Sequence, residues 1–402
     1  MHSKRFVGLM SVATVLLMVL AGFAAVPAGA GNEKFEVVVL FKDSIDEQVI
    51  KDNNGKVSKK FSLIPAVVTT VTAKDMMAME KSDKVKAVEK NHIYSIAKPS
   101  KDEKDPVTQA AEVLPWGVDR IDAEFVWPTE EESGYTGAGI TVAVIDTGID
   151  KDHPDLVENI IDGLNFVRKK GKVLPDAWDD DNGHGTHCAG IIAAEDNEEG
   201  VIGVAPDAGL YAIKVLNRRG MGFMTDIIAG IEHATDEEVH VISMSLGGPP
   251  SDSMAAAITA ASDAGIVLVG ASGNNGDERD PSVIYPAAYA DVIAVGATDV
   301  SDNVAIFSAY GDELDLVAPG VSIYSTYLRG GYAYGSGTSM ACPHVAGVVA
   351  LLLESDVEPG EVLGKLTGTA DALSDFDDKD GAGLVDAEEA VTGEDDTGND
   401  LP

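Results

Sequence analysis

Short apolar runs alternate with longer segments of helical periodicity from Leu114 onward. Runs such as ITVAVID, LYAIKVL and IVLVGAS are rich in β-branched residues and contain few polar positions. The segments between them, such as HGTHCAGIIAAE, TDIIAGIEHAT and SMAAAITAASDAG, are long enough to form helices. Strands that are apolar on both faces and separated by helices predict a parallel sheet that is covered on both sides. In such sheets the functional residues gather at the carboxyl ends of the strands.

Residues 33–97 follow a different pattern. The strand-like runs FEVVVLF and AVVTTV alternate there with the helix-like runs DEQVIKDN and AKDMMAMEKSD, which predicts a small α+β unit. The next segment, KPSKDEKDPVTQA, is charged, contains proline and has almost no apolar residue, so it is interpreted as a linker. The acidic end of the chain, residues 394–402, is predicted to be disordered.

The first 30 residues have the layout of a secretory signal peptide. Lys4 and Arg5 precede an uncharged apolar run, which ends in the small residues Ala28, Gly29 and Ala30. The run is also just long enough to act as an uncleaved membrane anchor. In either case we expect the remaining chain to be secreted or extracellular.

Charge divides the chain into two parts of opposite sign. The net charge is −38; residues 1–111 hold 16 Lys and Arg against 13 Asp and Glu, whereas residues 112–402 hold 13 against 54. This balance argues against nucleic acid or anionic lipid as partners. An acidic surface also keeps a secreted protein soluble, and it is compatible with saline surroundings because salt screens the self-repulsion.

Four polar residues at predicted strand or helix ends could together carry out nucleophilic chemistry. Asp146 ends the run AVID, His184 opens a helix in NGHGTHCAG, Asn274 follows a strand in GASGNNG, and Ser339 opens the helix of GTSMACPHVAG. A serine hydroxyl needs a base that takes its proton, and that base needs a carboxylate to orient it. The oxyanion that forms needs fixed donors, which a side-chain amide and a helix N-terminus supply.

The runs VAVIDTGIDKDHPDL, NGHGTHCAG, VISMSLGG, ASGNNG and GTSMACPHVAG resemble, in order and spacing, the motifs of subtilisin-like serine proteases. The resemblance covers residues 33 to about 393. It implies a three-layer α/β catalytic domain with a parallel sheet, preceded by a small α+β propeptide domain. It also implies that Asp146, His184 and Ser339 form a catalytic triad, and that Asn274 and the Ser339 N–H form the oxyanion hole.

The same resemblance implies a groove that holds a protein or peptide substrate as an added β-strand. Two backbone edges would bind the substrate, and side chains nearby would form two pockets. Ile284 stands where many relatives have glycine, so we expect a shallow primary pocket that favours small or medium apolar residues. The implied edges are Gly220, Met221, Gly222 and Ser245, Leu246, Gly247; the primary pocket is Leu246, Ala271, Gly273 and Ile284; the distant pocket is Met224 and Ile227.

Family members often hold a structural calcium ion, and the resemblance implies such a Ca²⁺ site here. All of its ligands would be oxygens from separate segments, which suits Ca²⁺ rather than a transition metal. The alternative is that the acidic loop AEDNEEG is only surface charge. A second cation site in DFDDKDGAG, residues 375–383, stays open because the EF-hand spacing is absent. The implied ligands are the side chains of Glu112, Asp155 and Asn197 and the carbonyls of Glu195, Glu199 and Val201.

The two cysteines, Cys188 and Cys342, are too few for a disulfide framework. We interpret them as small buried residues, with a disulfide between them as the alternative. A zinc site formed by His184, His187 and Cys188 is a weaker alternative, since the spacing lacks the usual remote ligands.

Together these patterns predict a monomeric secreted serine endopeptidase that is made as a preproenzyme and processed after Ala97. The expected parts are a signal peptide (1–30), a propeptide that assists folding and inhibits the enzyme (31–97), a linker (98–111), a catalytic domain (112–393) and a tail (394–402). The alternative is a calcium-stabilised binding protein that keeps the fold without turnover.

Overall fold

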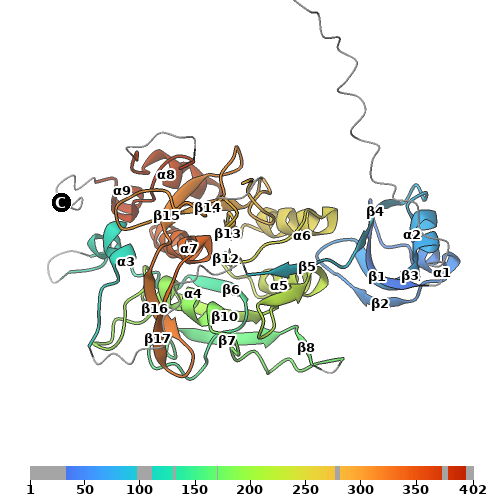
Figure 1. Ribbon diagram of the computed structural model, residues 1–402, viewed down its shortest axis with the longest axis horizontal. Helices are drawn as coiled ribbons and strands as arrows, with labels where there is room; N and C mark the ends of the chain where they lie inside the picture. The colour runs from blue at the N-terminus through green and yellow to red at the C-terminus, as the bar shows by residue number, and fades with distance from the viewer. Residues whose placement is uncertain are drawn as a thin grey trace, which may run out of the picture.

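The computed structural model describes residues 33–96, 111–129, 133–169, 171–276, 281–373 and 379–394, which form a small N-terminal unit and a larger unit (Figure 1). The predicted signal peptide, the linker up to residue 110 and residues 395–402 of the tail lie outside the described residues. Among the described residues, no helix has the length and apolar character needed to cross a membrane.

The N-terminal unit is an antiparallel sheet whose strand order is β2-β3-β1-β4. Val37, Val39 and Phe41 of β1 pack against the two helices of the unit, whereas Val38 and Leu40 join a core shared with the larger unit. Because neighbouring side chains on a strand point to opposite faces, this run must be apolar throughout. The elements are β1 (Lys34–Phe41), α1 (Glu47–Asp52), β2 (Val57–Lys60), β3 (Ala66–Thr72), α2 (Ala73–Met79) and β4 (Val85–Lys90).

The larger unit contains, within the described residues, the predicted parallel sheet, in the strand order β15-β14-β13-β12-β6-β10-β7. Its first strand, β6, lies between β12 and β10, so the chain continues to both sides of it. The carboxyl end of β6 is therefore at a position where α/β proteins bind ligands. The strands are β6 (Thr141–Asp146), β7 (Ile160–Asn165), β10 (Gly209–Lys214), β12 (Val241–Met244), β13 (Val267–Ala271), β14 (Ile293–Thr298) and β15 (Leu316–Pro319).

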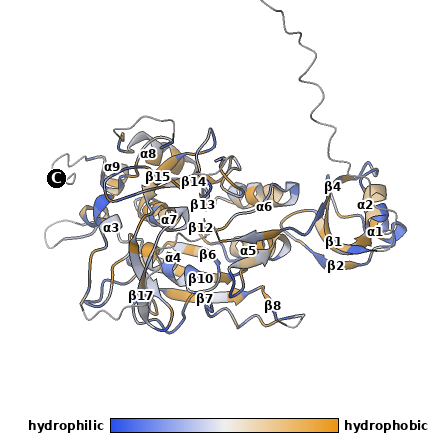
Figure 2. Cartoon of the chain, in the orientation of Figure 1, coloured by the Kyte–Doolittle hydropathy of each residue, from blue (hydrophilic) through white to orange (hydrophobic). Residues whose placement is uncertain are grey.

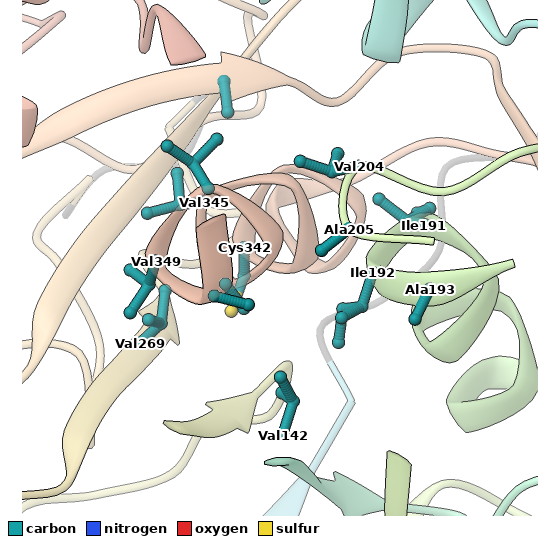
Figure 3. Close-up of a cluster of buried hydrophobic side chains, with 14 of the residues drawn as sticks. Val142, Ile191, Ile192, Ala193, Val204, Ala205, Val269, Cys342, Val345 and Val349 are labelled. Atoms are coloured by element: carbon teal, nitrogen blue, oxygen red, sulfur yellow. The ribbon is translucent and has the colours of Figure 1, made fainter. Parts of the chain in front are cut away.

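Helices cover both faces of this sheet. On one face α4 (His184–Ala193) and α7 (Thr338–Glu354) share a core with Val142 and Val144 of β6. On the other face α5 (Met224–Asp236) and α6 (Asp252–Asp263) pack against Ala143 and Ile145. Figure 3 shows part of the first core, where side chains of α4 and α7 lie beside β6 and β13. The three-layer α/β architecture is thus confirmed.

The N-terminal sheet packs on the outer side of α5 and α6, where its apolar face joins their core. In Figure 2 the hydrophilic colour gathers on outer loops and helix ends rather than at these packed layers.

The remaining elements of the described residues are short. They are β5 (Ile93–Ser95), β8 (Arg168–Lys169), β9 (Lys172–Val173), β11 (Met221–Phe223), β16 (Ile323–Tyr327), β17 (Gly331–Gly335), α3 (Trp116–Arg120), α8 (Val362–Gly368), α9 (Ala387–Thr392), and 3-10 turns at Ala123–Phe125 and Pro359–Glu361.

Candidate active site

Asp146 and His184 form a buried carboxylate–imidazole pair at the end of β6. Nδ1 of His184 lies 2.9 Å from each carboxylate oxygen of Asp146. A carboxylate can only accept, so Nδ1 donates and Nε2 is left as the acceptor nitrogen. The N–H of Thr147 donates to the same carboxylate over 2.6 Å, and the Thr147 hydroxyl accepts from the Gly185 N–H. Thr147 thereby joins the strand end to the first turn of α4.

The loop before α4 fixes the direction in which His184 enters the site. Gly183 has φ +108°, and a Cβ there would lie 2.4 Å from the Tyr327 ring, so only glycine fits without a shift. The buried Asp180 carboxylate accepts from the N–H groups of Asn182, Gly183 and Thr186. These contacts close the helix N-terminus in place of an ordinary cap.

The environment of His184 suits a general base. Burial alone lowers the pKa of His184, but the Asp146 carboxylate outweighs burial and holds that pKa well above the usual value. Its Nε2 is buried and has no hydrogen-bond partner among the described residues. A buried acceptor of this kind is costly unless a donor reaches it.

Ser339 lies in the first turn of α7, across from His184. Its hydroxyl donates to the Ser245 carbonyl over 3.4 Å, and its own carbonyl accepts from the Ser245 hydroxyl over 2.9 Å. The Cys188 thiol bridges the two helices, since Sγ lies 4.0 Å from His184 Nδ1 and 3.4 Å from the Ser339 carbonyl oxygen. The predicted serine–histidine hydrogen bond is not formed in this structure, as is frequent in enzymes without substrate.

Asn274 follows β13, and its amide is oriented by the residue before Ser339. The amide oxygen accepts from the N–H of Thr338 over 2.9 Å and from the Thr338 hydroxyl over 3.0 Å. The amide nitrogen faces Gly337, where a Cβ would approach it to 2.9 Å. Thr338, like Thr147 and Asp180, was missed by the sequence analysis, although each lies within four residues of a predicted catalytic residue.

The predicted groove is occupied by the chain itself. Strand β5 pairs antiparallel with β11, so that Ser95 faces Met221 and Tyr94 faces Gly222. Ser95 also exchanges both backbone hydrogen bonds with Gly247, at 3.0 and 2.8 Å. One step further, the Ile96 N–H donates to the Gly220 carbonyl over 2.9 Å. The two predicted edges therefore hold an added strand between them, whereas Ala97 lies outside the described residues.

The predicted pocket residues gather around this strand. Met224, Ile227 and Leu246 are fully or almost fully buried in one core with Tyr94. Ile284 packs into the space beside two glycines: a Cβ on Gly247 would lie 2.0 Å from Ile284 Cδ1, and one on Gly273 would lie 3.2 Å away. Ala271 ends β13 and is only 1% exposed, so it belongs to the core beneath this region.

The predicted calcium ligands come together from three segments. The Glu112 carboxylate accepts from the N–H groups of Asn197 and Glu198, at 2.9 and 3.1 Å. The fully buried Asp155 carboxylate accepts from the Asn197 amide and the Val201 N–H, at 3.1 and 3.0 Å. Burial raises the pKa of Asp155 to about 7. An oxygen-rich loop around a buried carboxylate has the donor chemistry that Ca²⁺ prefers.

Both cysteines are free thiols and are buried, as interpreted from the sequence, and the alternative disulfide is not formed. The His184, His187 and Cys188 set of the zinc alternative does not assemble, because Nε2 of His187 lies 3.1–3.2 Å from the carbonyl oxygens of Ile323 and Ala333. Asp146, His184 and Cys188 do lie close together, with ligand atoms within 4.8 Å of one another. The Asp146 carboxylate already hydrogen-bonds Nδ1 of His184. We therefore interpret these three side chains as a site in which a carboxylate orients an imidazole, rather than as a metal site.

Comparisons with known proteins agree with this geometry. A family model described as the subtilase family matches residues 137–383. Subtilisin NAT of Bacillus subtilis subsp. natto is 40% identical over 364 residues, which cover 88% of this chain and 90% of that protein. A thermostable alkaline protease of Halalkalibacterium halodurans is 40% identical over 352 residues, covering 87% and 88%. M-protease of Shouchella clausii is 37% identical over 407 residues, covering 96% and 100%.

Proposed function

The chain belongs to the subtilase family and is a subtilisin-like serine endopeptidase, and on this premise we propose that it is secreted as an inactive precursor that processes itself. The observation that carries the proposal is the segment Ile93–Ile96, which lies in the groove and pairs with Gly247, two residues after the Ser245 that contacts Ser339. A chain that fills its own substrate groove is poised both to be cut and to block the groove.

In the proposed mechanism the Ser339 hydroxyl attacks the carbonyl carbon of the scissile peptide and transfers its proton to His184 Nε2. Asp146 holds Nδ1 and stabilises the imidazolium that forms. The negative oxygen is stabilised by the Asn274 amide and the Ser339 N–H. His184 then protonates the leaving amine, which leaves an acyl group on Ser339. A water that is deprotonated by His184 attacks this ester and releases the acid.

The N-terminal unit is proposed to be the propeptide. It is held to the larger unit by polar contacts as well as by the shared core. The Glu89 carboxylate accepts from the N–H groups of Asp252 and Ser253 at the start of α6, at 2.8 and 2.9 Å. In return, Glu232 of α5 accepts from the Leu63 N–H over 2.9 Å and from the Ser62 hydroxyl over 2.6 Å. Carboxylates at helix N-termini are favourable for the helix dipole as well.

Residues 31–97 added in trans are expected to inhibit the mature enzyme, and Glu89→Ala should weaken that inhibition. Charge-assisted hydrogen bonds contribute about 1.5–3 kcal/mol, so the inhibition constant should rise about tenfold to a hundredfold. Glu80→Ala is the matched control, because Glu80 is an exposed carboxylate at the end of α2. Salt should weaken the inhibition only modestly, because residues 31–97 hold 11 Lys against 10 Asp and Glu, whereas residues 112–402 are strongly acidic. Equal constants for both variants would contradict the docking that we describe.

Calcium is proposed as a structural ligand of the loop between Glu195 and Val201. The side chains of Glu112, Asp155 and Asn197 would hold it, together with carbonyls of Glu195, Glu199 and Val201. The fit rests on the buried Asp155: its neighbour Glu195 adds a like charge, which a cation would offset. Bound calcium would tie the segment at Glu112 to this loop, and it takes no part in the chemistry at Ser339.

Calcium is expected to raise the melting temperature in proportion to the logarithm of its concentration, because only the folded state offers the site. Asp155→Ala and Glu112→Ala should reduce this response. A chelator should lower the melting temperature of the parent to the value of the calcium-free protein and should have less effect on these two variants. Asp196→Ala removes an exposed acid from the same loop and serves as the charge control. If the ligand variants respond to calcium as the control does, the ligand assignment is wrong.

A further inference from the structure

Tyr94 is the most deeply held residue of the strand in the groove. Its side chain is fully buried, and its hydroxyl donates to the Pro249 carbonyl over 2.7 Å. The ring lies against Gly248, where a Cβ would approach the ring carbon Cδ1 to 2.6 Å. Met224 and Leu246 belong to the apolar wall around it. The pocket therefore combines an apolar body with one polar acceptor at its end.

The acceptor is part of a loop that is fixed on both sides. Before Pro249, the Gly248 N–H donates to the Tyr285 carbonyl over 2.8 Å. After it, the Tyr289 hydroxyl accepts from the Ser251 N–H over 2.9 Å and donates to the Ser251 carbonyl over 2.8 Å. Pro249 itself has a restricted φ, which limits rotation of the segment. These contacts restrain the segment that carries the carbonyl oxygen.

Such an acceptor changes what the pocket can distinguish. An apolar pocket alone hardly separates phenylalanine from tyrosine, because the two rings have the same body. The Pro249 carbonyl does separate them, because it accepts from the fully buried hydroxyl of Tyr94 and a phenylalanine ring cannot make that hydrogen bond, although Pro249 itself is exposed. The advantage of tyrosine over phenylalanine is therefore one neutral hydrogen bond.

We propose that this pocket recognises a phenolic hydroxyl, so that the preferred substrates carry tyrosine four residues before the scissile bond. The position follows from the strand register, in which Ser95 pairs with Gly247 and Ile96 with Gly220, together with cleavage after Ala97. This inference rests on the proposed function, because it takes the chain's own segment as the stand-in for a substrate. Pro249 O is the specificity-determining acceptor, and Tyr289 is a positioning residue that acts through Ser251.

The test compares peptides of the form Xaa-Ser-Ile-Ala-p-nitroanilide with the mature enzyme that the full chain produces. Xaa is tyrosine, phenylalanine, 4-aminophenylalanine or alanine. The tyrosine peptide should exceed the phenylalanine peptide in kcat/KM by about threefold to tenfold, which is the effect of one neutral hydrogen bond. The 4-aminophenylalanine peptide should regain much of the difference, because its amino group also donates. Tyrosine and phenylalanine peptides cleaved within twofold of each other would overturn the inference.

The peptide series distinguishes a failure of the proposed function from a failure of hydroxyl recognition. If no peptide is cleaved at all, the proposed function is wrong and this inference falls with it. If all four peptides are cleaved at equal rates, only the recognition of the hydroxyl is wrong.

A substitution of the positioning residue gives a second readout. Tyr289→Phe should reduce the tyrosine-to-phenylalanine ratio of kcat/KM towards one, with the alanine peptide as the reference for any general loss of activity. Tyr211→Phe removes a phenolic hydroxyl that contacts His233 instead and should leave the ratio unchanged. An unchanged ratio in Tyr289→Phe would show that the Ser251 contacts do not hold the acceptor.

Discussion

Ser339→Ala is expected to abolish peptide hydrolysis and to leave the chain as an intact precursor. Without the hydroxyl there is no nucleophile, and the neighbouring His184 has no proton to take. The loss in kcat should be about a millionfold, a magnitude that is borrowed from subtilisin itself. The mass of the expressed chain measures processing, and a peptide substrate measures turnover. The parent should yield a new N-terminus at Lys98, whereas the variant should not.

Ser355→Ala provides the control, because Ser355 follows α7 and its hydroxyl donates only to the Leu352 carbonyl. It should process and hydrolyse as the parent does. A Ser339→Ala chain that still processes itself would remove Ser339 from the mechanism. A parent chain that folds and responds to calcium but cleaves nothing would favour the alternative of a binding protein without turnover.

Asp146→Asn should reduce kcat/KM by about ten-thousandfold, because an amide can orient the imidazole in the wrong tautomer and cannot stabilise its cation. It should also move the acidic limb of the pH profile. His184 acts as a base only when it is neutral, so activity falls as the pH drops through its pKa. The Asp146 carboxylate holds the pKa of His184 above its usual value. In the parent enzyme, kcat/KM should therefore begin to fall at a higher pH than it would with an ordinary histidine.

In Asp146→Asn burial remains and the carboxylate is gone, so the pKa of His184 should fall and the limb should shift to lower pH. The pH dependence of kcat/KM measures this shift. Asp181→Asn removes an exposed negative charge that contacts Lys214, and it controls for the long-range effect of charge. A limb at the same pH in Asp146→Asn and in the parent would mean that Asp146 does not set the basicity of His184.

The sequence was sufficient for the parts of the fold that are buried on both sides. β6 and β13 are continuous apolar runs because each lies between two layers of helices, and both were predicted. β7 was not, since it is the edge strand and exposes Ile161 and Asp162, which breaks the apolar pattern. The hairpin of β8 and β9 has no buried residue and leaves no hydrophobic signal at all.

Some residues of the candidate site could likewise be predicted from the sequence, and others could not. Asp146, His184, Asn274 and Ser339 were predicted because each stands at a strand or helix end within a distinctive local motif. Thr338 was not, although its contacts orient Asn274, because a threonine before a serine carries no signal of its own. The acceptor at Pro249 could not be predicted either, since it is a backbone atom whose role depends on a ring from residue 94, far away in the sequence.

The core that the two units share bears on whether the proposed release of the N-terminal unit can be reversed. Val38, Leu40 and Val68 of the N-terminal sheet share a core with α5 and α6. A small sheet that loses one of its two apolar covers retains too little burial to offset its chain entropy. We therefore expect the released segment to unfold. Proteases cleave unfolded chains more readily than folded domains. If the N-terminal unit is the proposed propeptide, its dissociation would then be followed by its digestion, so each copy would inhibit only once and activation would be irreversible.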